Sequence, residues 1–186
     1  LKPGVDFVIR RVLLVGIVLL GASLDFYNLV RIGVGVLLGV VGLIVVIILA
    51  ARWLGPRFGL RGKQALLLGI GTAICGSSAI VAAAPVLECE DEDVAVSVAT
   101  VNLLGVLAML AFPVLAALLA ISPDVYGVWC GLAIHATPQV IAAGFAHPVD
   151  GQTAGEIATI VKLVRISMLG PAILVIGTLY ARHRRR

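Results

Sequence analysis

Long apolar segments dominate this sequence and limit what it can fold into. Residues 32–51 contain no charged side chain, and a helix of about 20 residues crosses a hydrocarbon layer of about 30 Å. Over the whole chain 61% of residues are apolar and only 13% are charged, against about 25% charged in soluble domains. A soluble fold could not cover that apolar surface with polar groups. The sequence therefore predicts an all-α integral membrane protein.

Six apolar stretches are long enough to be considered as membrane spans. They are residues 8–24, 32–51, 65–87, 94–121, 126–146 and 155–180. We expect a single helical domain of about six transmembrane helices, residues 1–186, whose main partner is the lipid bilayer. The chain begins at Leu1 and ends in a basic run, which suggests a piece of a longer protein.

Lysine and arginine are unevenly distributed over the connectors. They lie before the first stretch, in 52–63 and in 182–186, whereas 88–93 and 147–154 have none. If every stretch crosses once, the three basic segments share one side, which the positive-inside rule assigns to the cytoplasm. We therefore expect an inner-membrane protein with both chain ends cytoplasmic and the acidic connector 88–93 on the far side.

The cysteines and glycines predict packing roles and no metal or disulfide chemistry. The cysteines Cys75, Cys89 and Cys130 form no CxxC pair and are odd in number, so neither a disulfide framework nor a zinc site is expected. No cofactor, metal or nucleic-acid partner is expected. The spacing Gly35-x-x-x-Gly39 predicts close helix packing, and homo-oligomer formation is left open.

The third stretch is unusually polar for a membrane helix. Its candidate solute-binding residues are Gly71, Thr72, Cys75, Gly76, Ser77 and Ser78. Irregular backbone at membrane depth survives only inside protein or beside a wet cavity. A break there would expose the N–H groups of a half-helix, which suit an anion and recur in transporter sites. Tight packing through small residues is the alternative.

The fifth stretch repeats this pattern around Pro138. The proline removes a backbone donor and disfavours helical geometry before it, and His135, Thr137 and Gln139 lie beside it. A histidine inside a span is a candidate for function and can move protons near neutral pH. A histidine that only hydrogen-bonds a neighbouring helix is the alternative.

The sixth stretch carries two cations. Lys162 and Arg165 are three residues apart and so share a helix face. Charges at membrane depth usually face a cavity or a partner, and Arg165 could grip an oxyanion through its planar fork. Alternatively, residues 155–165 lie along the membrane interface.

The third and fifth stretches align at an offset of 60 residues. Gly71, Ala73 and Ile74 match Gly131, Ala133 and Ile134, and the alanines at 82 and 83 match those at 142 and 143. One crossing lies between the two stretches, so both would run in the same direction. If all spans cross fully, the two cannot form an inverted repeat.

Four ordered blocks carry a resemblance to a known family. They are residues 71–80, 96–101, 135–144 and 161–165. The chain resembles the YeiH-like membrane proteins, which carry the label of sulfate exporters. The resemblance implies a fold of the cation/proton antiporter and bile-acid symporter type, with broken helices crossing near the midplane, and a longer chain.

The functional hypothesis is a secondary transporter that exports a small oxyanion such as sulfate or a sulfonate, and not an enzyme. Ser77, Ser78 and nearby backbone would bind the solute, Lys162 and Arg165 would balance its charge, and His135 would couple protons. One alternative is an intramembrane hydrolase with a serine nucleophile and His135 as base. Another is a structural subunit without transport activity.

Overall fold

The computed structural model describes residues 34–184, and every regular element in that range is helical. The elements are α4 (Val34–Leu54), the 3-10 helix η2 (Gly55–Phe58), α5 (Gly62–Ala73), α6 (Ser77–Leu87), α7 (Asp91–Leu119), α8 (Pro123–Ala133), α9 (Thr137–Phe145), α10 (Gly151–Ser167) and α11 (Leu169–Arg184). The expected span 8–24 lies outside the described residues. The predicted all-α class is confirmed for the part described.

Three helical segments are long and apolar enough to cross a membrane. They are Leu38–Phe58, Asp91–Leu119 and Gly151–Thr178, and they correspond to the expected second, fourth and sixth spans. The last of these bends at Met168, between α10 and α11. The expectation of about six crossings is not confirmed, because the third and fifth stretches fold differently.

The third stretch is a helical hairpin, α5–α6, rather than a crossing. Lys63 Nζ at its start donates to the carbonyl oxygen of Glu88 at its end, at 2.7 Å. A Cβ on Gly71 would lie 2.6 Å from Ile80 Cδ1, so the two helices run side by side. With 12 and 11 residues, each helix is only about 17 Å long, which is half of the hydrocarbon layer.

The fifth stretch is a second hairpin, α8–α9. Tyr126 Oη near its start donates to the carbonyl oxygen of Ala143 near its end, at 2.9 Å. His147 Nε2, just after α9, lies 3.0 Å from the carbonyl oxygen of Ile121, just before α8. The prediction that residues 65–87 and 126–146 are spans is therefore wrong for both, because each returns to the end of the molecule from which it enters.

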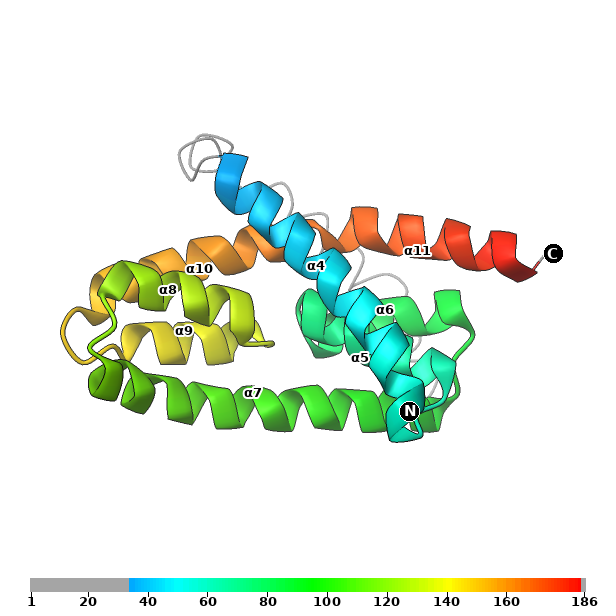
Figure 1. The fold of residues 1–186 in the computed structure, drawn as a ribbon, viewed down its shortest axis with the longest axis horizontal. Helices are drawn as coiled ribbons and strands as arrows, with labels where there is room; N and C mark the ends of the chain where they lie inside the picture. The colour runs from blue at the N-terminus through cyan, green and yellow to red at the C-terminus, as the bar shows by residue number, and fades with distance from the viewer. Residues whose placement is uncertain (1–33, 185–186) are drawn as a thin grey trace, which may run out of the picture.

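The two hairpins enter from opposite ends of α7. Arg61, before α5, pairs with Glu90 at 2.8 Å and with Asp93 at 3.1 Å, at the start of α7. The second hairpin begins and ends near Ile121, beyond the other end of α7. Figure 1 shows α7 along one side, with the tips of both hairpins meeting near its middle. The acidic connector 88–93 thus lies beside the basic connector before α5, not on the far side as predicted.

Small residues allow the second hairpin to pack closely on α10. A Cβ on Gly131 would lie 2.7 Å from Val161 Cβ, and one on Gly144 would lie 3.0 Å from Ala158 Cβ. By contrast, a Cβ on Gly35 or Gly39 would meet nothing within 4 Å in the described structure. Close packing through small residues therefore occurs, but the predicted glycine pair on α4 does not provide it.

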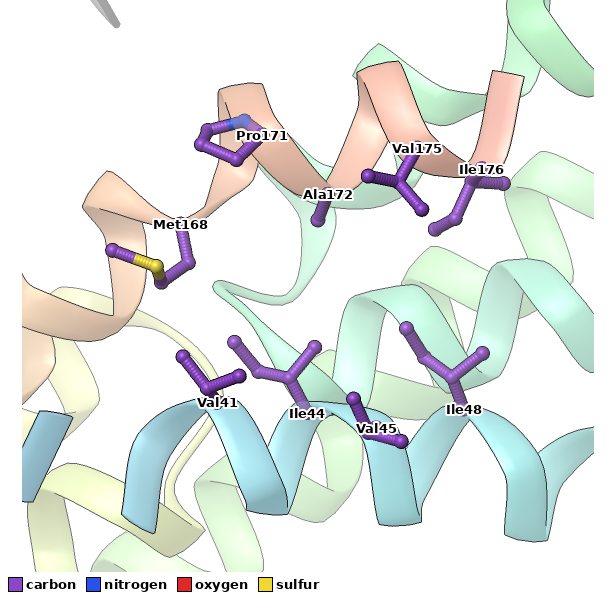
Figure 2. Close-up of a pocket in the computed structure, with 9 residues that line it drawn as sticks. All are labelled: Val41, Ile44, Val45, Ile48, Met168, Pro171, Ala172, Val175 and Ile176. Carbon is purple, nitrogen blue, oxygen red and sulfur yellow. The ribbon is translucent and has the colours of Figure 1, made fainter. Parts of the chain in front are cut away.

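An apolar groove runs between α4 and α11 (Figure 2). Its volume is about 310 Å³. The lining residues are Val41, Ile44, Val45, Ile48, Met168, Pro171, Ala172, Val175 and Ile176. With no ionisable group in its lining, this groove suits lipid or another apolar segment and not a charged solute.

Candidate solute site at the hairpin tips

The tip of the first hairpin is a three-residue turn, Ile74 to Gly76. The helix α5 ends at Ala73 and α6 begins at Ser77. Gly76 has φ +71° and ψ −127°, a conformation open to glycine and costly for other residues. The predicted break in the third stretch is confirmed, although it is shorter than the glycine-rich segment suggested.

The tip of the second hairpin is formed by Ile134, His135 and Ala136, between α8 and α9. Pro138 lies in the first turn of α9, where a missing N–H costs nothing because that N–H has no partner within the helix. The tips of the two hairpins touch: a Cβ on Gly76 would lie 3.4 Å from His135 Cβ. The two breaks that the sequence indicates are therefore brought together.

Lys162 fills the space between the tips and is fully buried. Its ammonium donates to the carbonyl oxygens of Ile74 at 3.1 Å and Ile134 at 3.0 Å, and also to that of His135. An ammonium group has three donors, and all three are used on backbone.

Arg165 lies one turn further along α10 and is also fully buried. Its Nε donates to the carbonyl oxygen of Ala73 at 2.6 Å, and its terminal nitrogens donate to those of Thr72 and Leu132. The guanidinium therefore binds the last turn of α5 and the last turn of α8 together.

These two cations cap the C-terminal ends of α5 and α8. The last carbonyls of a helix have no partner within it, and they carry a partial negative charge that attracts cations. The prediction that Lys162 and Arg165 are buried on a shared face is confirmed. Most of their donors, however, point at backbone carbonyls.

A polar cluster lies at the N-terminal ends of α6 and α9. Ser77 Oγ donates to Asn102 Oδ1 at 2.9 Å, and Gln139 Nε2 donates to the carbonyl oxygen of Asn102 at 3.2 Å. A Cβ on Gly105, one turn along α7, would overlap Gln139 Oε1. Sequence reasoning identified Ser77 and Gln139 but missed Asn102 and Gly105.

The other candidate residues are distributed around the same tips. The carbonyl oxygen of Thr72 accepts a hydrogen bond from Arg165. Cys75 is buried. Cys75, Cys89 and Cys130 are all free thiols. Ser78 is exposed at the start of α6.

His135 and Thr137 complete the set on the second hairpin. His135 is only 8% exposed, and its Nδ1 has no hydrogen-bond partner among the residues that the structure describes. Thr137 is half-buried at the start of α9.

The offset of 60 residues extends beyond the tips. The starts of α6 and α9 are residues 77 and 137, and the starts of α7 and α10 are residues 91 and 151. Because neither hairpin crosses the membrane, the objection to an inverted repeat no longer applies. A hairpin followed by a long helix occurs twice, in opposite directions. At the same offset Asn102 corresponds to Lys162, and Gly105 corresponds to Arg165.

The cations bind equivalent atoms of the two hairpins. Lys162 binds the carbonyl oxygens of Ile74 and Ile134, and Arg165 binds those of Thr72 and Leu132. In each case the two acceptors are 60 residues apart. Lys162 and Arg165 therefore lie where the two repeats meet.

Fold and site together define a helical membrane protein with two opposed hairpins and a buried cationic centre. The chain belongs to the family described as Conserved hypothetical protein 698, whose model matches residues 1–186. The resemblance to the YeiH-like proteins is thereby confirmed.

Relatives of this chain carry the name UPF0324 membrane protein, and three of them illustrate the similarity. One from Brucella melitensis is 40% identical over 174 residues, which cover 94% of this chain and 48% of the relative. One from Bartonella henselae is 41% identical over 181 residues, 97% of this chain and 51% of the relative. One from Bacillus cereus is 37% identical over 179 residues, 96% of this chain and 52% of the relative. The chain thus spans about half the length of these relatives. No solved structure matches it.

Proposed function

We propose that this chain forms the hairpin core of a secondary transporter that exports a small anionic solute, such as sulfate or a sulfonate, across the inner membrane. The relatives are named only as membrane proteins, so the transport role and the solute are inferred from the site. In support of this, two opposed hairpins meet beside the middle of α7 (Figure 1), and half-helix ends with polar side chains of this kind form the substrate sites of many secondary transporters.

The observation that carries the proposal is the pair of buried cations at the tips. Within residues 34–184, Lys162 and Arg165 have no carboxylate partner; their bonds go to carbonyl oxygens. Each helix C-terminus offers only about half a negative charge. Two full positive charges against two half charges leave the centre positive, and the N-terminal ends of α6 and α9 add to that potential. An anion is the solute that such a centre favours.

The polar cluster supplies the neutral groups for such a solute. Ser77 and Gln139 meet Asn102 at the start of α6 and α9, and Ser78 is exposed beside them. In this scheme the cations act on the solute through their field, while hydroxyl, amide and backbone N–H groups contact it. Ser77 donates to Asn102 and not to His135, an arrangement that favours transport over the hydrolase alternative.

The orientation follows from the connectors. The end of α7 that carries the base of the first hairpin also carries Arg52, Arg57, Arg61 and Lys63, whereas the connectors at its other end, 120–122 and 146–150, have no lysine or arginine. The positive-inside rule then places the base of the first hairpin in the cytoplasm.

Transport into proteoliposomes by the full-length protein tests the proposal, with radiolabelled sulfate and taurine as separate probes. Asn102→Leu is expected to reduce uptake at least about tenfold, because it removes the side-chain acceptor of Ser77 Oγ beside the solute, while Gln139 keeps its bond to the backbone carbonyl of residue 102. Thr100→Val is the matched control on α7, since within residues 34–184 Thr100 Oγ1 donates only to the carbonyl oxygen of Val96 in its own helix. No uptake of either probe by the wild-type protein would favour a structural subunit. Equal uptake by Asn102→Leu and Thr100→Val would remove the cluster from the site.

A further inference from the structure

The described structure divides into two packed bodies. One consists of the second hairpin and α10, which are held together by contacts such as Gly131 on Val161 and Gly127 on Ile157. The other consists of the first hairpin with α4 and α7, where a Cβ on Gly69 would lie 2.7 Å from Ala51 Cβ. Each body is internally close-packed through small residues.

The bodies meet along α7, where the rings of Phe112 and Trp129 stack with centroids 4.1 Å apart, and at the hairpin tips, where their polar contacts lie. Lys162 and Arg165, which belong to the body of the second hairpin, bind the carbonyl oxygens of Thr72, Ala73 and Ile74 in the other body. They bind equivalent carbonyls of their own hairpin at the same time. Both side chains are fully buried, so separating the tips would leave two charges and several carbonyls without partners in apolar surroundings.

We infer that Lys162 and Arg165 are positioning residues that lock the two hairpin tips into one unit, so that the hairpins move together and not as independent gates. The same bonds that satisfy the half-helix ends prevent either tip from opening alone. Alternating access would then come from movement of the joined hairpins against the rest of the full-length protein. The inference holds whichever solute is carried.

Distance measurements between spin labels on the two hairpins test this inference without a transport assay. Labels are attached to Gly62→Cys at the start of α5, where a Cβ would meet nothing within 4 Å, and to Ala142→Cys, which is exposed on α9. The full-length protein is used, with the three cysteines of this chain replaced by alanine. With wild-type cations we expect one narrow distance distribution, identical with and without added sodium sulfate. A change in the mean distance on addition of sulfate would overturn the inference.

Substitution of the cations supplies the second arm. Lys162→Met with Arg165→Met is expected to broaden the distribution or shift its mean, and Arg165→Lys, which keeps the charge but loses the fork, is expected to broaden it less. Lys63→Met is the matched control, because the hydrogen bond of Lys63 in the described part of the chain lies within the first hairpin, to the carbonyl oxygen of Glu88, and its loss should leave the distribution unchanged. If the double variant fails to give a monodisperse protein, Arg165→Lys decides alone. A distribution in Arg165→Lys identical to that of the wild type would then overturn the inference.

Discussion

Gly76 and His135 are in contact where the two hairpins meet, and a Cβ on Gly76 would lie 3.4 Å from that of His135. The two residues are far apart in sequence, and each belongs to the turn of a different hairpin. Their contact brings the unwound parts of both hairpins to one point, which Lys162 and Arg165 then bind from α10.

Gly76→Ala should destabilise the protein by about 1–3 kcal/mol, because a residue with a Cβ is strained at φ +71°. The measurement is the unfolding free energy of the purified protein in mixed micelles. Gly62→Ala is the control, since it adds a methyl group to an open helix start. Equal stability of the two variants would show that the turn can relax without cost.

Gly131→Ala should cost about 1–3 kcal/mol through overpacking. Its new methyl group would lie 2.7 Å from Val161 Cβ and 2.8 Å from the carbonyl oxygen of Ala158. Gly39→Ala, on the open face of α4, should be neutral or slightly stabilising. The thermal midpoints of both variants check the prediction, and a larger loss for Gly39→Ala would mean that the glycine pair on α4 packs against another part of the protein.

Asp150 caps α10 by accepting from the backbone N–H of Thr153 at 3.0 Å. Hydrogen bonding from Thr153 lowers the pKa of Asp150 below its ordinary value. The folded-state pKa is thus below the unfolded value of about 3.9. The cap is therefore fully stabilising above that value, and its contribution is lost as the pH falls through the folded-state pKa.

Asp150→Ala should consequently lower the thermal midpoint at neutral pH, and the difference from the wild type should shrink as the medium is acidified below about pH 4. Asp150→Asn retains an acceptor at the N-cap and should lose less at neutral pH. A difference that stays constant with pH would mean that the carboxylate charge plays no part in the cap.

The hairpin topology predicts which residues share a side of the membrane. In a protein without its native cysteines, Arg57→Cys and Asp91→Cys should react with an impermeant maleimide from the same side, and Asp124→Cys from the other. Six full crossings would instead place Arg57 with Asp124 and put Asp91 on the other side. Labelling of right-side-out and inverted vesicles distinguishes the two arrangements.

The sequence predicted the breaks but not how the chain turns at them. Glycine, proline and hydroxyl residues around Gly76 and Pro138 indicated discontinuous helices, and these occur at Ile74–Gly76 and Ile134–Ala136. Apolar composition is the same for a half-length hairpin and a full crossing, so the count of crossings could not be read from hydropathy. The offset of 60 was the available signal for Asn102, which it aligns with Lys162. That alignment indicates equivalent positions of an inverted repeat only once the hairpins are known to run in opposite directions.

Composition by itself determined that this is a helical membrane protein, because only a bilayer accepts so much apolar surface. The three-residue spacing of Lys162 and Arg165 put these two cations on one helix face. Only the tertiary structure decided what those cations bind. Whether Lys162 and Arg165 meet a solute, a headgroup or a carbonyl depends on where the ends of α5 and α8 lie, and that is set by contacts between residues about 30 to 90 positions apart. Hydrogen bonds over such separations leave no local pattern in the sequence.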